Sequence, residues 1–276
     1  MSLDVARALR EGLDRLASRN GVLFVGIFLL VSLLGNVALD SAALALETLS
    51  TELAAETGQP QPDPIPEEAT PLGFELPGSV ITLLVLVWLL AWAATSIVAV
   101  RVMATDHTNE IPDDLLSRRL TLATINEIFA RIVVLVLVSI GLLAFLLPGI
   151  FLAICFYFVR PLIAIEDRNA IDAMVESWRL SKGNRFAILV LLIGAVVIYA
   201  AISIAGTLGA LALSALSAAG IVVSVTFAAV ANVFWLAVSA RAYAQLRETI
   251  EEREEIDESA EPDSNDEWND PDGVEW

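Results

Sequence analysis

Residues that could carry out chemistry are sparse in this sequence and form no recognisable catalytic set. Its one histidine, His107, stands between Asp106 and Thr108 in a polar stretch, where an imidazole is usually solvated rather than a ligand or a base. The one cysteine, Cys155, has no partner for an intrachain disulfide. No glycine-rich phosphate loop, HExxH, GxSxG or paired-cysteine motif occurs. We therefore expect a protein without enzymatic activity, cofactor or bound metal.

Transport would instead need polar side chains inside apolar segments. The few that qualify are Asn36, Arg160, Ser203, Thr207 and Asn232. We expect the Asn232 amide to hydrogen-bond across to Ser203 or Thr207 in the preceding apolar segment. Arg160 should extend to the inner membrane surface, and Pro161 should kink the helix there. A solvent-filled cavity reaching Asn232 would favour a permease instead.

The elements that position these residues are long apolar segments. The chain is 57% hydrophobic with a mean hydropathy of +0.71, which indicates a membrane protein. A helix needs about 20 apolar residues to cross a bilayer. Six segments qualify, at residues 21–39, 79–100, 128–147, 149–165, 186–207 and 221–240. The sequence thus predicts an all-α, integral membrane six-helix bundle, in which the Pro148-Gly149 pair forms the turn of a tight hairpin.

The distribution of basic residues predicts the orientation. All 16 lie in four groups, with four before the first span, four in 101–131, five in 160–185 and three from Arg241 onward. The predicted external loop 40–77 has eight acids and no base, and the connection 208–220 has no charge. Because basic loops stay cytoplasmic, we expect a cell-membrane protein with both termini in the cytoplasm. The alternative is that an acid-rich composition produces this asymmetry by chance.

The sequence is strongly acidic. Its net charge is −18, residues 246–276 contribute −12 of this, and arginines outnumber lysines 15 to 1. Such a composition resembles proteins of extreme halophiles, which points to a halophilic, archaeal source, because molar salt screens crowded carboxylates. We expect residues 246–276 to form a disordered cytoplasmic tail. The tail is either simply solvated or a docking segment.

A charged stretch between the fourth and fifth segments predicts an amphipathic helix over 170–182. Asn169 is suited to cap its start and Gly183 to end it. One face carries an apolar stripe of Ile171, Met174, Val175 and Trp178. This stripe rests either at the inner membrane interface, with Arg179, Lys182 and Arg185 near headgroups, or against the protein's own loops. Residues 1–20 predict a similar cytoplasmic amphipathic helix, and a rougher one precedes the third segment. The layout suggests three units of an amphipathic helix and a two-span hairpin, although convergence could produce the same pattern.

The run from Leu146 to Ile193 resembles the glycerophosphoryl diester phosphodiesterase membrane-domain family. The matching residues are Pro148, Gly149, Pro161, Glu166, Ser177, Trp178, Arg179, Lys182, Gly183 and Asn184. Hydrolysis in that family belongs to a soluble barrel with catalytic histidines and metal-binding carboxylates. Because this sequence has no room for that barrel, the resemblance implies a stand-alone membrane domain and no enzyme.

These features predict a non-enzymatic multi-pass protein that organises or senses the cytoplasmic leaflet through its amphipathic helices. Its expected partners are membrane lipids, together with a second copy of the chain or another membrane protein, and not nucleic acid. The alternative is a component that transports a small solute or a lipid.

Overall fold

The computed structural model describes residues 3–66, 69–105, 111–213 and 217–260. It is 85% helical. In chain order the helices are α1 (Val5–Ala17), α2 (Arg19–Thr57), α3 (Gly78–Ala104), α4 (Asp113–Ser117), α5 (Leu120–Ala144), α6 (Leu146–Cys155), α7 (Val159–Glu166), α8 (Ala170–Ser181), α9 (Arg185–Ala212) and α10 (Ser217–Ala260). Six helical segments are long and apolar enough to cross a membrane, with α6 and α7 together forming the fourth. The all-α, six-span architecture is therefore confirmed.

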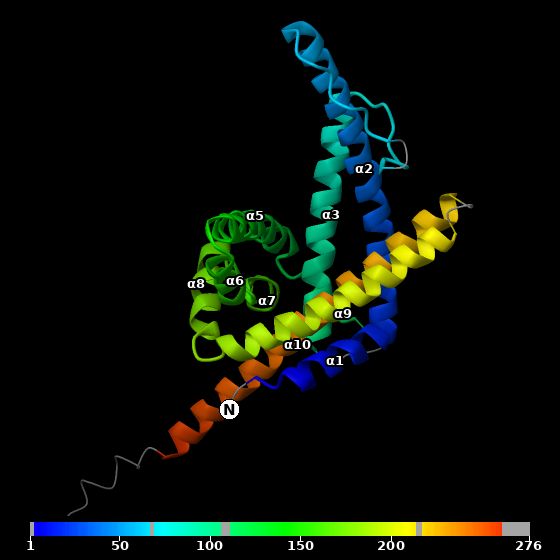
Figure 1. The fold of residues 1–276 in the computed structure, drawn as a ribbon. Helices are drawn as coiled ribbons and strands as arrows, with labels where there is room; N and C mark the ends of the chain where they lie inside the picture. Colours follow the sequence, from blue (N-terminus) through cyan, green and yellow to red (C-terminus); the bar gives the residue numbers. More distant parts are fainter. Residues whose placement is uncertain (1–2, 67–68, 106–110, 214–216, 261–276) are drawn as a thin grey trace, which may run out of the picture.

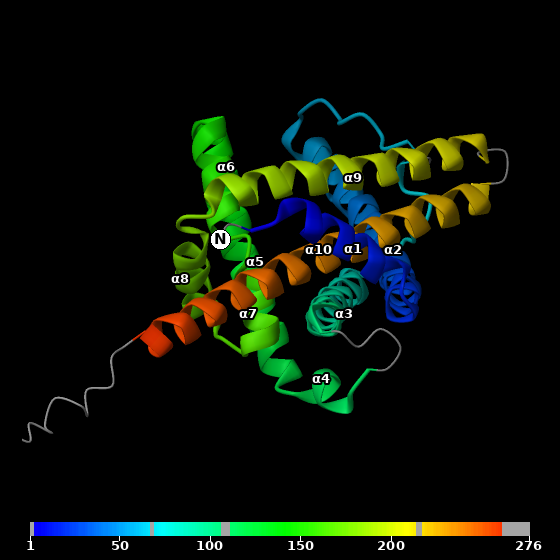
Figure 2. The ribbon, with the colours of Figure 1, turned by 90° about the horizontal axis from the view of Figure 1, so that it is seen from below.

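The six spans form three hairpins, each preceded by a shorter helix. Helix α1 precedes α2 and α3, α4 precedes α5 with α6–α7, and α8 precedes α9 and α10. This is the order expected for three successive units. The hairpins run in three clearly different directions instead of lying parallel, like the legs of a tripod (Figures 1 and 2). The six-helix bundle is thus built from three splayed hairpins that pack on one another at a common end.

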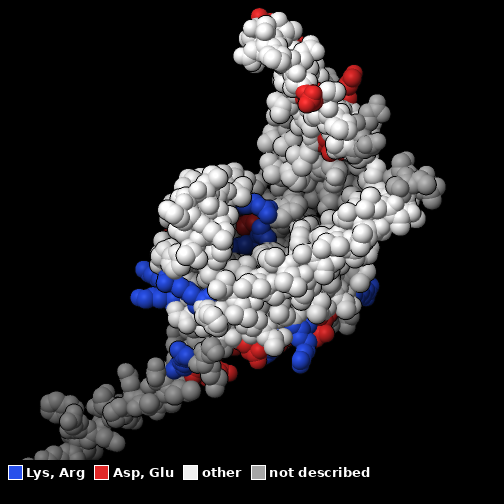
Figure 3. Space-filling model, in the orientation of Figure 1, with Lys and Arg blue, Asp and Glu red and all other residues white. Residues whose placement is uncertain are grey.

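The legs meet at one end, which we call the base, and the hydrophobic core lies there. Buried residues cluster in the early turns of α2 and α9, the late turns of α3, and the middle of α10. At the base, α10 packs against α1, α2, α3 and α9. Charged side chains also gather around the base, while the legs are mostly covered by uncharged residues, apart from acidic side chains toward the tip of the α2–α3 leg (Figure 3). This separation of surfaces is typical of a protein whose legs lie in lipid.

Helix α1 is packed into the base and does not lie free on a surface. Its side chains Ala8 and Gly12 are buried, and a Cβ at Gly12 would come within 2.5 Å of Val238 Cγ2 in α10. Close approach of the two helices therefore depends on the small residues of α1. The amphipathic helix predicted for residues 1–20 is present, and α10 and α9 cover much of its apolar stripe.

Two boundaries differ from the sequence prediction. The external loop was expected to begin at Asp40, but α2 continues to Thr57 and ends at Gly58, whose φ is +67°. The alanines, leucines and glutamates of this stretch favour a helix, and glycine readily takes the left-handed conformation of a helix end. The second boundary is the start of the tail, which was expected to be disordered from residue 246. Helix α10 instead continues to Ala260, because the glutamates and arginines of this stretch are also good helix formers. Residues 261–276 lie outside the described part.

The fourth span is broken. The predicted turn at Pro148-Gly149 is wrong, because the chain turns at the extended residue Phe145 and both residues belong to the first turn of α6. Proline is tolerated there because its missing N–H would have no partner in the helix. The interruption predicted at Pro161 is present as a full break of the helix just before this proline, which lies in the first turn of α7. The break itself spans residues 156–158, between α6 and α7.

A serine in the following helix closes this break. The Ser177 hydroxyl donates a hydrogen bond to the Cys155 carbonyl at 2.8 Å and accepts one from the Phe158 N–H at 3.2 Å. All three residues are buried, so the backbone groups freed by the break would otherwise lack partners in an apolar region. The two hydrogen bonds of Ser177 thus allow the helix to break within a membrane span. They also give this serine a structural role next to Trp178.

Candidate functional site

A hollow lies between the legs of the tripod. It consists of two adjoining cavities of about 310 and 340 Å³ that share Arg131, Arg160 and Trp235. Residues of α3, α5, α6, α7, α9 and α10 or of the α6–α7 break line it. Figure 3 shows that the hollow is open between the legs and that basic and acidic side chains lie inside it. It is therefore a charged recess within the membrane-spanning part of the molecule.

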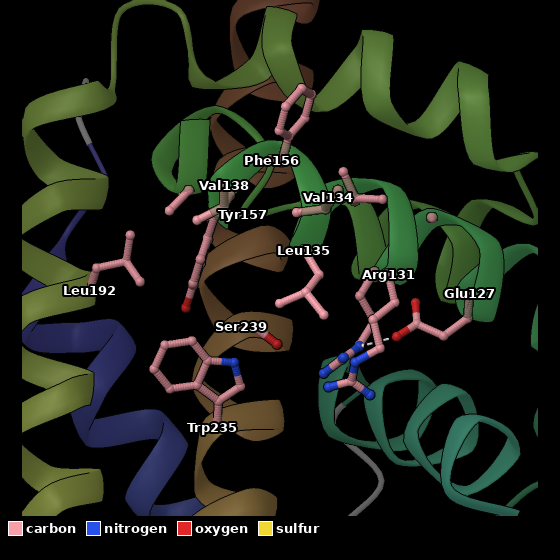
Figure 4. Close-up of a pocket in the computed structure, with 14 residues that line it drawn as sticks. Glu127, Arg131, Val134, Leu135, Val138, Phe156, Tyr157, Leu192, Trp235 and Ser239 are labelled. Atoms are coloured by element: carbon pink, nitrogen blue, oxygen red, sulfur yellow. Dashed lines mark hydrogen bonds and ion pairs between the residues drawn. The ribbon is translucent and has the colours of Figure 1, made fainter. Parts of the chain in front are cut away.

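The charges come from three side chains on neighbouring elements (Figure 4). Arg160, at the start of α7, donates from Nε to Glu127 Oε1 of α5 at 2.7 Å, and Glu127 is only 2% exposed. Arg131 lies one helical turn after Glu127 in α5, and its guanidinium carbon lies 3.5 Å from the centre of the Trp92 ring. Arg160 lies 5.1 Å from the same ring. One tryptophan thus faces two arginines, of which one is already paired with a carboxylate.

Arg131 has no such carboxylate partner. None of the ion pairs found across the described residues includes it. It follows the start of α5 by eleven residues, or about 16 Å along the helix, so it lies near the middle of the helix that forms the third span. A positive charge at this depth is costly without a compensating anion. The lining of the hollow therefore holds two guanidiniums and one carboxylate, an excess of one positive charge.

Aromatic and polar groups line the rest of the hollow. Tyr157 and Trp235 lie on the side away from Arg131 (Figure 4), and their rings make an edge contact at 6.3 Å. The Tyr157 hydroxyl is buried and has no hydrogen-bond partner. Asn232 lines the second cavity together with Tyr199. The site thus combines a cation, an unused hydroxyl donor and aromatic walls.

Several sequence predictions about polar residues in the spans are wrong. Arg160 pairs with Glu127 in the hollow, a partner that the sequence prediction lacked. Asn232 donates to Ala228 O of its own helix at 2.9 Å, and not to Ser203 or Thr207. Thr207 likewise bonds within α9, to Ser203 O. In each case the polar side chain hydrogen-bonds to a carbonyl or carboxylate that lies close to it. The partner that we expected is therefore not needed.

Glu127 and Arg131 are site residues that the sequence prediction did not include. The third span was expected to begin at Ile128, so Glu127 was placed outside the membrane. Arg131 was counted with the basic residues of the cytoplasmic loop. Helix α5 actually begins at Leu120. The signal was available, because an acid and a base four residues apart stand on one helix face amid continuous apolar residues.

At the base, buried ion pairs tie the legs together. Arg101 of α3 is 2% exposed and donates to Asp167 Oδ1 at 2.9 Å and to Ala164 O at 2.6 Å. Arg241 of α10 donates to Glu11 Oε2 of α1 at 2.8 Å. Burial raises the pKa of Glu11, but hydrogen bonds from Arg241 and Arg7 outweigh this effect, so the net pKa lies below its ordinary value. These pairs join elements far apart in sequence.

Glu166, a residue of the resemblance motif, belongs to the same base. Its carboxylate pairs with Arg168 and Arg247 and accepts a hydrogen bond from the Tyr243 hydroxyl. These partners occupy the loop after α7 and the helix α10. Glu166 is thus fully engaged in joining α7 to α10, which is a structural role.

Helix α8 was predicted within one residue of its observed bounds. Asn169 caps it by accepting from the Asp172 N–H at 2.9 Å, and Gly183 has a φ of +99°. Its buried face is a row of small residues, Ala170, Ala173, Ser177 and Ser181. Of the predicted apolar stripe, only Met174 packs against the core. Ile171, Val175 and Trp178 are exposed by 65%, 48% and 39%.

The other motif residues surround the junction of α8 and α9. Trp178 makes ring contacts with Phe151 and Phe156 of the broken span, and the Arg185 guanidinium lies over the Trp178 and Phe151 rings. A recess of about 490 Å³ at this end is lined by Arg179, Lys182, Gly183 and Asn184 together with residues between 246 and 253 of α10. It is separate from the hollow and lies at the base.

Metal-binding clusters can be assigned only among the described residues. Across the described ranges no group of three His, Cys, Asp or Glu residues could hold an ion. His107 lies outside those ranges. The structure thus brings together Arg160 and Asn232 of the predicted site residues, adds Glu127 and Arg131, and leaves Ser203 apart from the hollow lining.

Six membrane-length helices and a charged recess between them define this chain as a multi-pass membrane protein. It belongs to the family described as "Domain of unknown function (DUF7847)", whose model matches residues 3–246. No curated protein and no solved structure matches it.

Proposed function

We propose that this protein binds an anionic membrane lipid in the hollow, without catalysing a reaction. The observation that carries the proposal is Arg131, a guanidinium inside a membrane span with no carboxylate partner. An anionic headgroup would compensate its charge, and phosphate oxygens suit the planar donors of a guanidinium.

The shape and lining of the hollow favour a lipid over a small solute. Beyond the arginines, its walls are apolar, from residues such as Val134, Leu135, Val138 and Leu192. The outer halves of α5 and α9 are exposed and apolar, so the acyl chains of a bound lipid can remain in the bilayer. The second cavity reaches Asn232, the feature expected of a permease, so lipid transport is the extension of this proposal. Leu146–Ile193 also resembles a membrane-domain family associated with glycerophosphodiester enzymes, which fits a lipid ligand.

Replacing Arg131 with glutamine tests the proposal. The purified protein would be mixed with phosphatidylglycerol or with zwitterionic phosphatidylcholine, and bound lipid measured by native mass spectrometry. The unchanged protein should prefer phosphatidylglycerol, and R131Q should lose at least about tenfold in affinity, because a hydrogen bond to a charged group contributes roughly 1.5–3 kcal/mol.

The matched control is R10Q, which removes an exposed arginine from α1 and should leave lipid binding unchanged. Equal affinity of the unchanged protein for the two lipids would contradict the proposal. Arg131 would then be free to pair with a carboxylate of another protein.

A second role is supported by the exposed stripe of α8. Ile171, Val175 and Trp178 remain uncovered beside exposed Arg179 and Lys182, an arrangement suited to an anionic membrane surface. We propose that α8 lies on the cytoplasmic leaflet and organises or senses it, with both termini in the cytoplasm. The concentration of charged side chains at the base supports this orientation.

A nitroxide attached at position 171 or 179 tests the α8 role. After I171C the label should collide with oxygen dissolved in lipid more than with aqueous nickel, and after R179C the order should reverse. The R179C thiol should react with an impermeant maleimide only after cells are opened, and buried Cys155 should not react. Preferential nickel access at position 171 would rule out the interfacial role.

A further inference from the structure

The charges that face the hollow can be counted. Among the residues that line its two cavities, only Glu127, Arg131 and Arg160 are charged. Glu127 and Arg160 form a pair at 2.7 Å with side chains 3% and 19% exposed, so together they carry no net charge. Arg131 adds one positive charge, and the hollow as a whole carries one.

Net charge determines which ligand is favourable in a recess of low dielectric. There, a charge without a counterion is costly, and interactions between charges are stronger than in water. A ligand with one negative charge makes the occupied hollow neutral. A ligand with two negative charges leaves one in excess, close to the carboxylate of Glu127. The buried glutamate therefore opposes the second charge.

We infer that the hollow selects a headgroup with a single negative charge, a phosphodiester rather than a phosphomonoester, and that Glu127 determines this specificity. The inference rests on the proposed function and names its ligand class. Glu127 acts by occupying Arg160 and by repelling extra negative charge, so it need not touch the ligand.

The Tyr157 hydroxyl adds a neutral donor to the same recess. Its oxygen is buried and makes no hydrogen bond in the structure, although a buried hydroxyl normally has a partner. A phosphodiester keeps two oxygens free to accept hydrogen bonds. The Tyr157 hydroxyl lies on the side of the hollow away from Arg131 (Figure 4). A hydrogen bond that it donates requires no second charge on the ligand.

The experiment compares phosphatidylglycerol, a phosphodiester, with phosphatidic acid, a phosphomonoester. Native mass spectrometry at about pH 8.5, where a phosphomonoester carries close to two charges, would measure the affinity of both. The unchanged protein should bind phosphatidylglycerol more tightly by about tenfold. E127Q frees Arg160 and raises the net charge to two, so it should abolish or reverse this preference.

A double variant separates charge from folding. E127Q/R160Q removes the internal pair but keeps a net charge of one, so it should again prefer phosphatidylglycerol. Thermal unfolding would establish that each variant is folded. If E127Q does not fold, the double variant and the unchanged protein still test the charge count, because both must prefer the phosphodiester.

Three outcomes distinguish the possible failures. If the unchanged protein binds phosphatidic acid as well as or better than phosphatidylglycerol, or if folded E127Q keeps the original preference, the inference is wrong and the proposed lipid site stands. If neither lipid binds better than phosphatidylcholine, both fail. If glycerophosphoglycerol, which lacks acyl chains, binds as tightly as phosphatidylglycerol, the ligand is a soluble phosphodiester and not a lipid.

Discussion

Replacing Arg101 with methionine should lower the free energy of unfolding by about 3–5 kcal/mol, the typical cost of breaking a buried ion pair by removing one partner. The Arg101 side chain is 1% exposed and donates to Asp167, Ala164 O and Leu115 O. Methionine is of similar length but donates no hydrogen bond. The two carbonyls and the carboxylate would therefore lose a donor at the centre of the base.

Unfolding by SDS in mixed micelles measures this loss. The control is R179M, because the Arg179 side chain is 73% exposed and its carboxylate neighbour Glu176 is 3.9 Å away. Exposed pairs contribute at most about 1 kcal/mol. A similar, small effect of both substitutions would show that the Arg101 network does not hold the base together.

Replacing Gly149 with valine should destabilise the second hairpin by about 3 kcal/mol, near the upper end of typical overpacking costs. A Cβ at this position would lie 2.4 Å from Leu142 Cγ and 2.6 Å from the Leu142 backbone nitrogen. A flexible side chain could move, but the backbone of α5 cannot move without separating from α6. The conformation of Gly149 is ordinary, so the close approach alone requires glycine.

Gly26 provides the matched control, because a Cβ there would meet nothing within 4 Å. G26V changes the same residue type within a membrane helix and should leave the midpoint of thermal unfolding nearly unchanged. Equal midpoints for G149V and G26V would contradict the close packing of α5 on α6.

The six spans could be predicted because each is a long apolar run, and such runs are themselves the physical requirement for crossing a bilayer. The caps of α8 could also be predicted, since Asn169 and Gly183 act on residues next to them. The predicted ends of α2 and α10 were wrong because both helices continue beyond their apolar runs. Hydropathy marks where a helix enters lipid, and not where it stops.

The candidate site depends on contacts between residues that are far apart in the sequence. The pair of Glu127 with Arg160 joins residues 33 positions apart, and the break beside Tyr157 depends on Ser177. Neither contact has a periodic signature in the sequence. The directions of the three hairpins, which create the hollow, follow from packing at the base and could not be derived from hydropathy.

The tripod arrangement also concerns the shape of the membrane around the protein. Three legs that meet at the base and diverge toward their tips occupy more lateral area in one leaflet than in the other. The surrounding lipids must match this taper, and a bilayer that is convex on the side of the tips does so with least distortion. With the legs placed in a bilayer this shape is a wedge, so we expect the protein to concentrate where the membrane curves in that direction.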